Sequence, residues 1–264
     1  KGFLIGATSG RTTLNGEGLQ HQDGHSHILS STIPNCLSYD PAFAYEVAVI
    51  VKNGIKEMFV EQKNYFYYIT TINENYSHPQ MPEGSESGII KGMYKLKGEE
   101  NAQIRLLGSG AILREAIKAK ELLEKFNIKA EVWSVTSFNL LRKDGMEVER
   151  FNQLNPSKEP SPSYVEQCFS DSDIPVIAAT DYMRSYSEQI RPYIKSTFFT
   201  LGTDGYGRSD SRETLRDFFE VNSKSISRAA AYALYKTKVI SEDQIVDIYK
   251  TLKVDTTKPN PWEV

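Results

Sequence analysis

The stretch GEGLQHQDGHSH, from residue 16 to residue 27, concentrates titratable side chains more than any other part of the chain. It holds three of the four histidines and two carboxylates, which are Glu17, His21, Asp23, His25 and His27. The ordinary pKa of imidazole is about 6.5, so a small change of environment moves a histidine across neutral pH. Imidazoles that converge on a carbonyl group can donate hydrogen bonds to a developing oxyanion and carry protons. Proton chemistry at a carbonyl is therefore the first function that this stretch suggests.

Two other interpretations of the histidines remain open from the residues alone. The spacing H-x3-H-x-H with an aspartate inside would suit zinc or iron, but residues four apart share a face only on a helix. Gly16, Gly18 and Gly24 make a helix unfavourable here, so we predict no metal site. The histidines could also be solvated residues of an ordinary loop. The same glycines let the backbone turn sharply and approach a ligand, which favours an active-site loop.

The composition is that of a soluble globular protein, with 39% hydrophobic and 25% charged residues among 264. This length allows one large domain or two smaller ones. The net charge of −3 and the lack of a basic stripe argue against a nucleic-acid partner. Cys36 and Cys168 lie far apart and suggest a reducing compartment. With no apolar run near the ~20 residues of a membrane span and no signal peptide, we predict a cytoplasmic protein without membrane contact.

The first third of the chain is predicted to alternate strands, a long loop and one helix. Because KGFLIGATS opens without methionine and enters a buried strand at once, we expect a truncated beginning. The helix should start with Asp40 as N-cap and Pro41 in its first turn, and continue to about Phe59. Its apolar face would be Ala44, Val47, Ala48, Val51 and Ile55. The strands are expected over residues 3–7, 32–39 and 65–71, and the histidine-rich loop over residues 11–31.

Residues 73–101 are rich in proline, glycine, serine and charge, and we place a domain boundary there. A short piece inside it, GIIKGMYKL, is helix-like. His78 precedes a proline in this segment and is expected to be solvated.

The remainder alternates strands and helices in a way that predicts an α/β domain with a mostly parallel sheet. The helix over residues 111–126 has Ile112, Ala116, Ala119 and Leu123 on one face. A short helix should follow Thr136 or Ser137, and another should begin at Ser241 with a capping box to Gln244. In GTDGYGRSDSRE we expect a turn into a helix with Asp210 as N-cap and Glu213 reaching back. Further strands are predicted over residues 103–107, 129–135, 174–180 and 197–201, and a further helix over residues 182–190.

Long motifs along the chain resemble those of one family. They are ATSGRTTLNGEGLQHQDGHSH, IPNCLSYDPAFAYEVAVIV, YYITTINENY, MPEG, LLGSGAIL, VWSVTSF and LGTDGYGRSDSRETLRDFFEV. The chain is similar to the last third of the homodimeric bacterial pyruvate dehydrogenase component, the acetyl-transferring, thiamine diphosphate-dependent first enzyme of its complex. The resemblance implies an α/β fold: residues 1–95 would be the C-terminal half of a pyrimidine-binding domain. Residues 96–264 would be a transketolase C-terminal-like domain.

The resemblance also implies an activity and partners for the full-length parent. Such an enzyme oxidatively decarboxylates pyruvate and reductively acetylates the lipoyl group of dihydrolipoyl acetyltransferase, and it acts as a homodimer. His21 would face the thiamine ring and pyruvate as the catalytic histidine, with Glu17 in the same segment. Asp23 and His27 match an Asp-Gly-x-x-His pattern aimed at substrate, and His25 occupies a position where transketolases place a proline.

Part of the family's cofactor machinery has no counterpart in this sequence. Members hold magnesium and the diphosphate with a Gly-Asp-Gly motif, and the nearest strings here are QDG, KDG and TDG. The glutamate that activates the thiamine ring would lie before Lys1. We therefore expect thiamine diphosphate and Mg²⁺ in the full-length parent, and neither cofactor nor activity in these residues alone. The alternatives are a transketolase-like or another 2-oxo acid dehydrogenase, or a non-catalytic module for dimerisation or assembly.

Overall fold

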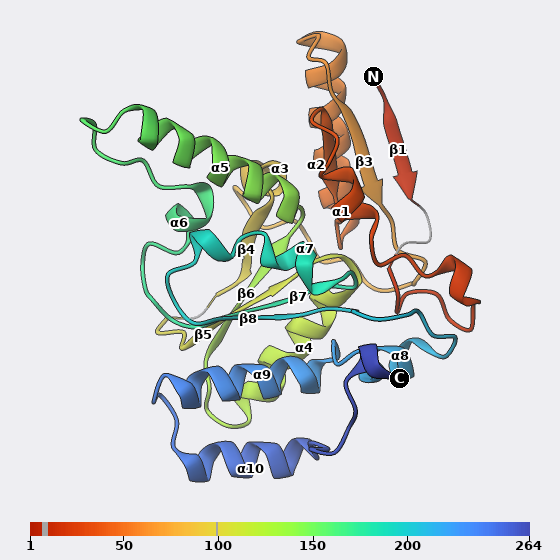
Figure 1. The fold of residues 1–264 in the computed structure, drawn as a ribbon, viewed down its shortest axis with the longest axis vertical. Helices are drawn as coiled ribbons and strands as arrows, with labels where there is room; N and C mark the ends of the chain where they lie inside the picture. Colours follow the sequence, from red (N-terminus) through yellow and green to blue (C-terminus); the bar gives the residue numbers. More distant parts are fainter. Residues whose placement is uncertain (7–9, 99) are drawn as a thin grey trace.

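A parallel sheet of three strands, in the order β1-β3-β2, forms the N-terminal part of the molecule (Figure 1). The computed structural model describes residues 1–6, 10–98 and 100–264. Its first strands are β1 (Phe3–Gly6), β2 (Cys36–Tyr39) and β3 (Phe66–Thr70). The strands predicted over 3–7 and 65–71 are confirmed within the described residues, while β2 starts four residues later than predicted. The loop before β2 contains two short helices, η1 (Leu19–His21) and α1 (Ser26–Ser30).

The helix that connects β2 to β3 ends close to its predicted end but differs from its prediction at the start. Helix α2 (Ala44–Ile55) follows Phe43 as N-cap and continues into a π-helical turn, η2 (Lys56–Val60). Asp40 is not its cap, because the Asp40 side chain is buried and bonded elsewhere. The first free amides are instead satisfied by Glu46, which accepts from the backbone of Ala42 and Phe43 at 2.6 and 3.0 Å.

The buried face of α2 is also not the predicted one. The residues that it buries are Glu46, Ile50 and Gly54, which are spaced four apart. Gly54 lies against Phe3, where an added Cβ would come within 2.8 Å of the ring. Glu46 can be buried because Tyr94 and Ser134 also donate to it. The positions predicted to be buried are exposed or only half-buried: Ala44, Val47, Ala48, Val51 and Ile55.

A second sheet has five strands in the order β4-β6-β5-β7-β8, parallel except for β4, which pairs antiparallel with β6. The mostly parallel sheet predicted from the strand-helix alternation is thus confirmed. The strands are β4 (Met93–Lys97), β5 (Ile104–Gly108), β6 (Ala130–Val135), β7 (Val176–Ala179) and β8 (Phe198–Leu201). Helices cover both faces of this sheet (Figure 1).

One face of the larger sheet carries α4 (Leu113–Glu124), α9 (Ser223–Lys236) and α10 (Glu242–Leu252). The other face carries α5 (Phe138–Leu154), α6 (Tyr164–Cys168) and α7 (Arg184–Glu188). The remaining short elements are α3 (Glu86–Lys91), α8 (Arg212–Phe218), η3 (Gly110–Ile112), η4 (Arg191–Tyr193) and η5 (Pro261–Glu263). Among the described residues, none of these helices has the length and apolar character that crossing a bilayer requires.

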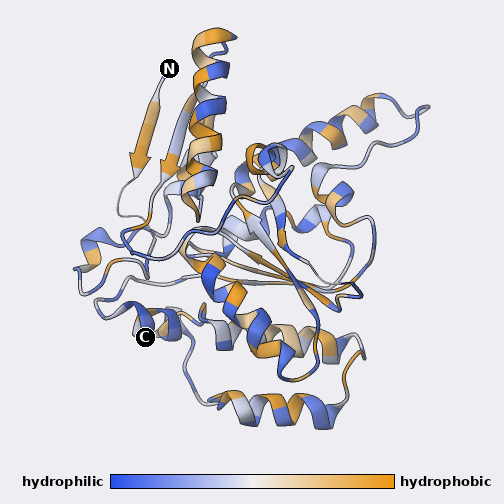
Figure 2. Ribbon diagram, turned by 180° about the vertical axis from the view of Figure 1, so that it is seen from behind, coloured by the Kyte–Doolittle hydropathy of each residue, from blue (hydrophilic) through white to orange (hydrophobic). Residues whose placement is uncertain are grey.

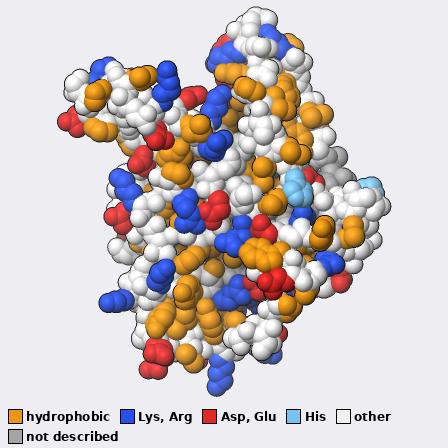
Figure 3. Space-filling view, viewed as in Figure 1, with side chains coloured by type: hydrophobic (Ala, Val, Ile, Leu, Met, Phe, Trp, Pro, Cys, Tyr) orange, Lys and Arg blue, Asp and Glu red, His pale blue; other side chains and the backbone are white. Residues whose placement is uncertain are grey.

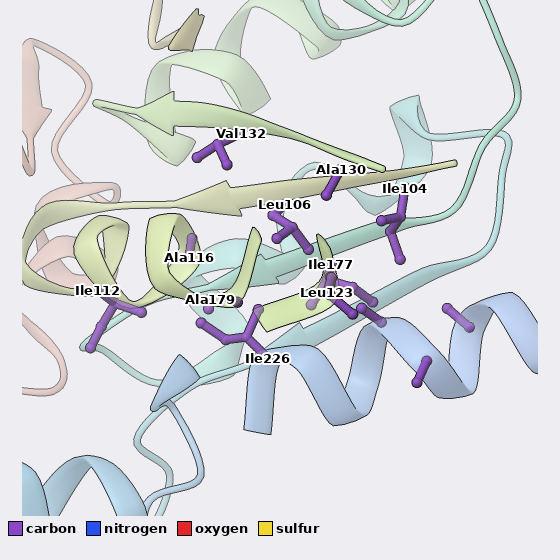
Figure 4. Packing of buried hydrophobic residues seen from close by; sticks show 14 of the residues in the cluster. Ile104, Leu106, Ile112, Ala116, Leu123, Ala130, Val132, Ile177, Ala179 and Ile226 are labelled. Atoms are coloured by element: carbon purple, nitrogen blue, oxygen red, sulfur yellow. The ribbon is translucent and has the colours of Figure 1, made fainter. Parts of the chain in front are cut away.

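The main core lies between the larger sheet and the layer of α4 and α9 (Figure 4). Strand residues such as Leu106, Val132 and Ile177 have no exposed surface and pack against Ala116 and Leu123 of the helix layer. The face predicted for the helix over 111–126 is confirmed, because all four of its residues are fully buried. This rigid layer supports the loops at the carboxyl ends of β5 and β7.

Several local predictions are corrected by the structure. The helix-like piece GIIKGMYKL divides at Gly92, whose φ of +116° ends α3, and its second half is strand β4. The predicted boundary at residue 95 falls within this strand, and the domain limits stay a prediction. Helix α8 is capped by Ser211 rather than Asp210. Helix α5 is much longer than predicted, whereas its cap Ser137 and the box of Ser241 with Gln244 are confirmed.

A buried carboxylate joins the two parts of the chain. Asp181, directly after β7, accepts hydrogen bonds from the hydroxyls of Thr12 and Thr13, both at 2.7 Å. The backbone amide of Thr12 donates to the same carboxylate at 3.1 Å. Gly10 has a φ of +90°, and a Cβ on it would lie 2.2 Å from Oδ2 of Asp181. Only glycine therefore lets the backbone pass this close to Asp181.

Replacing Gly10 by alanine should destabilise the protein more than the same change at Gly16. Both glycines have positive φ, but a Cβ on Gly16 (φ +72°) would meet nothing within 4 Å. Gly16→Ala should cost about 1 kcal/mol from backbone strain alone. Gly10→Ala must also displace Asp181 from its donors, at about 1 kcal/mol for each lost bond. Urea unfolding of the two variants measures the difference, and equal free energies of unfolding would contradict this account.

Candidate active-site loop

The histidine-rich loop is held against the segment between β8 and α8. The side-chain amide of Gln22 pairs with the backbone of Arg208: Nε2 donates to the carbonyl, and Oε1 accepts from the amide at 2.7 Å. The backbone amide of Gly16 donates to the carbonyl of Asp210 at 2.9 Å. A Cβ on Gly207 would approach Oε1 of Gln22 to 2.7 Å. The segment GTDGYGRSD, predicted only as a turn, therefore supports the loop that carries the histidines.

His21 is an exposed titratable residue of this loop and is paired with Glu17. It ends the 3₁₀ turn η1, and its side chain is 52% exposed. Its Nε2 lies 3.9 Å from Oε2 of Glu17, whose side chain is 54% exposed. An ion pair this exposed contributes well under 1 kcal/mol. The His21 ring is therefore free to exchange Glu17 for a ligand.

His25 is exposed as well and lies beside a buried guanidinium. Its Nε2 is 3.4 Å from Nη2 of Arg11. Arg11 is only 3% exposed, and its Nη1 donates to the carbonyls of Thr203 and Gly205. Burial lowers the pKa of Arg11, an effect that nearby carboxylates, Asp204 foremost, oppose. Since a guanidinium can only donate, Nε2 of His25 faces it as an acceptor.

Asp23 uses its carboxylate locally. Oδ1 accepts from the backbone amides of His25 and Ser26, both at 2.9 Å, and Oδ2 accepts from the Ser26 hydroxyl. These bonds satisfy free amides at the start of α1. Asp23 was predicted to face a substrate. In this structure its carboxylate instead stabilises the turn between His21 and α1.

His27 is separated from the other two histidines by burial. It has no exposed surface, and its ring stacks on Tyr186 with the centroids 4.8 Å apart. The edge of Tyr182 meets the same ring, at 4.7 Å between centroids. Burial lowers the pKa of His27 to about 3, so the ring is neutral at physiological pH. The structure therefore presents His21 and His25 on the surface and encloses His27 beneath it.

The described residues offer no carboxylate or imidazole set for a metal. No group of three or more His, Cys, Asp or Glu side chains is placed to hold an ion in the ranges that the structure describes. On the face shown in Figure 3, basic and acidic side chains are interspersed rather than gathered by sign.

Reasoning from the sequence missed the residues that position the loop. The local sequence gives Arg11, Gln22 and Asp181 no distinguishing pattern, although Gln22 lies directly between His21 and Asp23. Asp181 could have been found, because a polar residue directly after a buried parallel strand lies at the sheet edge where sites form. His78 is exposed, as predicted, and its Nδ1 accepts a hydrogen bond from the amide of Ala44 at 3.1 Å.

Comparison with protein families finds two matches that together span most of the chain. Residues 1–79 match the pyruvate dehydrogenase E1 component middle domain. Residues 92–222 match the transketolase-like TK C-terminal domain. Residues 80–91, in the segment between β3 and β4, lie between the two matches.

Curated relatives match over essentially the whole chain. A pyruvate dehydrogenase E1 component from Pseudomonas aeruginosa is 55% identical over 267 residues, or 99% of this chain. That from Escherichia coli is 52% identical over 266 residues, and that from Cupriavidus necator is 49% identical over 269. The chain spans 30% of the length of each of these relatives.

Solved structures show the same fold at low sequence identity. A transketolase from Pichia stipitis superposes with a TM-score of 0.65 over 89% of this chain and 30% of its own, at 19% identity. A split-gene transketolase, described as an inactive beta4 tetramer, has a TM-score of 0.57 at 16% identity and covers 88% of this chain and 66% of its own. These neighbours establish a transketolase-like fold. From the two domain matches and identities near 50% along its whole length, we conclude that the chain belongs to the pyruvate dehydrogenase E1 family.

Proposed function

We propose that this chain is the substrate-facing C-terminal part of a cytoplasmic, acetyl-transferring pyruvate dehydrogenase. The full-length protein would oxidatively decarboxylate pyruvate and pass the acetyl group to the lipoyl arm of dihydrolipoyl acetyltransferase. Identity of about 50% to proteins named pyruvate dehydrogenase E1 component supports this reaction over that of a transketolase, for which the structures share under 20% identity.

The observation that carries the proposal is the accessibility of His21 on a loop that is otherwise fixed. The residue after it, Gln22, pairs with the Arg208 backbone, and Arg11 holds the loop at His25. A ring that is solvent-facing on a fixed backbone can meet a carbonyl or carboxylate without a large ordering cost. We assign to His21 the contact with the substrate carboxylate or lipoyl sulfur and the proton movements there. Glu17 is its neighbour on the loop.

Thiamine diphosphate with Mg²⁺ is the cofactor that we propose for the full-length protein. The described residues of this chain do not fit its diphosphate and metal, since they contain no group of three or more candidate metal ligands in reach of one ion. We therefore route no step through the cofactor here and assign to this chain only contacts with substrate. Its residues alone should be inactive.

Exposed apolar side chains on the N-terminal part support association with another chain. The edge strand β1 is hydrophobic along its length (Figure 2), and its Leu4 and Ile5 are 59% and 50% exposed. Phe59 and Val60, at the end of η2, are also exposed. Exposed apolar surface of this kind marks interaction sites. This surface supports a homodimer of the full-length protein. The second candidate function of the isolated chain is a non-catalytic role in dimerisation or assembly.

Replacing His21 by alanine in the full-length enzyme should lower kcat by about 100-fold or more, the usual effect of losing a proton-transferring group. Affinity for thiamine diphosphate should change little, because His21 lies on a loop without metal or diphosphate ligands. Steady-state kinetics and calorimetry with the cofactor measure the two effects. Gln20→Ala is the matched control, since Gln20 is an exposed residue of the same turn. Activity of the His21 variant within a few-fold of wild type would refute the assignment.

The 264-residue chain should bind thiamine diphosphate and Mg²⁺ too weakly to be detected at micromolar protein concentrations. Titration calorimetry tests this, and sedimentation of the same sample reports whether the chain self-associates. Tight, saturable cofactor binding would contradict the absence of a metal-ligand set. If the chain has only a role in dimerisation or assembly, it should self-associate without binding the cofactor.

A further inference from the structure

A buried row of hydrogen bonds joins His27 to Asp40 through the hydroxyl of Thr70. Nε2 of His27 lies 3.0 Å from Oγ1 of Thr70, and this hydroxyl donates to Oδ1 of Asp40 at 2.7 Å. His27 and Thr70 have no exposed surface, and Asp40 is 3% exposed. The row runs from α1 across the end of β3 to the residue after β2, so it connects three elements of the N-terminal part.

The partners of the Thr70 hydroxyl determine where the His27 proton lies. Oγ1 of Thr70 is also 3.2 Å from the carbonyl oxygen of Tyr39. A hydroxyl has one hydrogen, and both an ionised carboxylate and a carbonyl can only accept. While Asp40 is ionised, that hydrogen is therefore directed to Asp40 or Tyr39, and the contact with His27 is a hydrogen bond only if Nε2 carries the proton. Because the buried ring is neutral, Nδ1 is then bare.

The surroundings of the ring leave it little freedom. Tyr186 stacks on it and Tyr182 packs against it in a T-shaped arrangement, while Nδ2 of Asn139 donates to the His27 carbonyl at 2.7 Å. Nδ1 has no hydrogen-bond partner among the described residues. The opposite tautomer would bury an unpaired N–H there, at a cost of about 1–3 kcal/mol. The enclosed geometry thus favours one ring orientation and one tautomer.

We propose that Thr70 and Asp40 are positioning residues, which fix His27 as the Nε2-protonated tautomer and thereby hold α1 and the histidine loop that precedes it. The proposal rests on the function proposed for His21, because α1 begins only five residues after His21 in the sequence. Asp40 also connects this row to the larger sheet: its backbone amide donates to the carbonyl of Thr136 at 2.8 Å, and its carbonyl accepts from Gly110 at 3.1 Å. A displaced Asp40 would thus disturb both parts.

The two titratable ends of the row have opposite effects on stability. Burial raises the pKa of Asp40 from 3.8 to about 7, so its contribution to stability falls as pH rises through that range. Burial lowers the pKa of His27 from 6.5 to about 3, so its contribution falls as pH drops through that range. The charged groups that face them are Asp181 and Glu46 at Asp40 and Asp23 at His27.

Asp40→Asn removes the group whose contribution to stability increases as the pH falls. The stability that His27 loses at acid pH should then no longer be offset. The free energy of unfolding of this variant should fall more steeply than that of wild type as the pH is lowered from 6.5 towards 4. Urea unfolding across this range measures both slopes. Parallel slopes in variant and wild type would show that Asp40 is not the buried carboxyl group that this row requires, and would overturn its positioning role.

The tautomer is measured directly by nuclear magnetic resonance of the chain labelled with ¹⁵N at its four histidines. In wild type at a pH above the Asp40 pKa of about 7, where Asp40 is ionised, the neutral His27 ring should show a protonated Nε2 and a bare Nδ1. Thr70→Val, which removes the hydroxyl at nearly constant volume, should shift this pattern towards Nδ1–H or a mixture, whereas Thr70→Ser should retain it. An Nδ1-protonated His27 in wild type overturns the proposal even if the valine variant does not fold.

Kinetics of the full-length enzyme distinguish a positioning role from packing. Thr70→Val should lower kcat about tenfold, with KM for pyruvate changed less, because a displaced loop costs catalysis more than binding. Thr70→Ser should recover most of the activity. Equal losses in both variants would show that the hydroxyl is irrelevant and overturn the proposal. His21→Ala assayed in parallel separates the two hypotheses: full activity there refutes the role of His21, while the tautomer measurement still decides the role of Thr70.

Discussion

The placement of the histidine loop depends on the burial of one carboxylate, that of Asp181. Burial raises its pKa, which shows that the carboxylate is taken out of water at a cost. The backbone amide and hydroxyl of Thr12 and the hydroxyl of Thr13 donate to the carboxylate and offset this cost. Nε of Arg216 in turn donates to the Thr12 hydroxyl at 3.3 Å. The loop cannot separate from β7 without leaving this group unpaired. The end of a strand in the larger sheet and the start of the loop therefore form one unit.

A second charge cluster extends the same connection. Glu74, in the segment after β3, pairs with Arg114 at 2.5 Å and Arg216 at 2.7 Å, and Arg212 lies 3.9 Å away. Arg212 also donates to the carbonyl of Thr13 at 2.6 Å. Three guanidiniums from α4 and α8 thus hold both segments that leave the smaller sheet. The resulting interface is polar and directional, so it fixes a relative position rather than only an area of contact.

Much of the fold follows from local patterns, and the exceptions have a common cause. The helix over 111–126 and the continuous apolar strand β7 could be predicted because their periodicity alone specifies burial on a sheet. The buried face of α2 could not be predicted in this way, because Glu46 can be buried there only since Tyr94 and Ser134 donate hydrogen bonds to it. Likewise, the sequence indicates that the histidines form a candidate site, but not that Tyr182 and Tyr186 enclose only His27. Partners more than 40 residues distant decide these cases, and no local pattern contains them.

The bonds that hold the loop span nearly the whole chain. Gln22 and its partner Arg208 are 186 residues apart, and Arg11 and Thr203 are 192 apart. A protein made from its N-terminus exposes the histidine segment on the ribosome long before these partners exist. Contacts of such separation also form late in folding, because the entropy of closing a large loop must be overcome first. The imidazoles of the loop should thus acquire their final arrangement only after β8 and the segment that follows it have been made, and a nascent chain stalled before β8 should lack it.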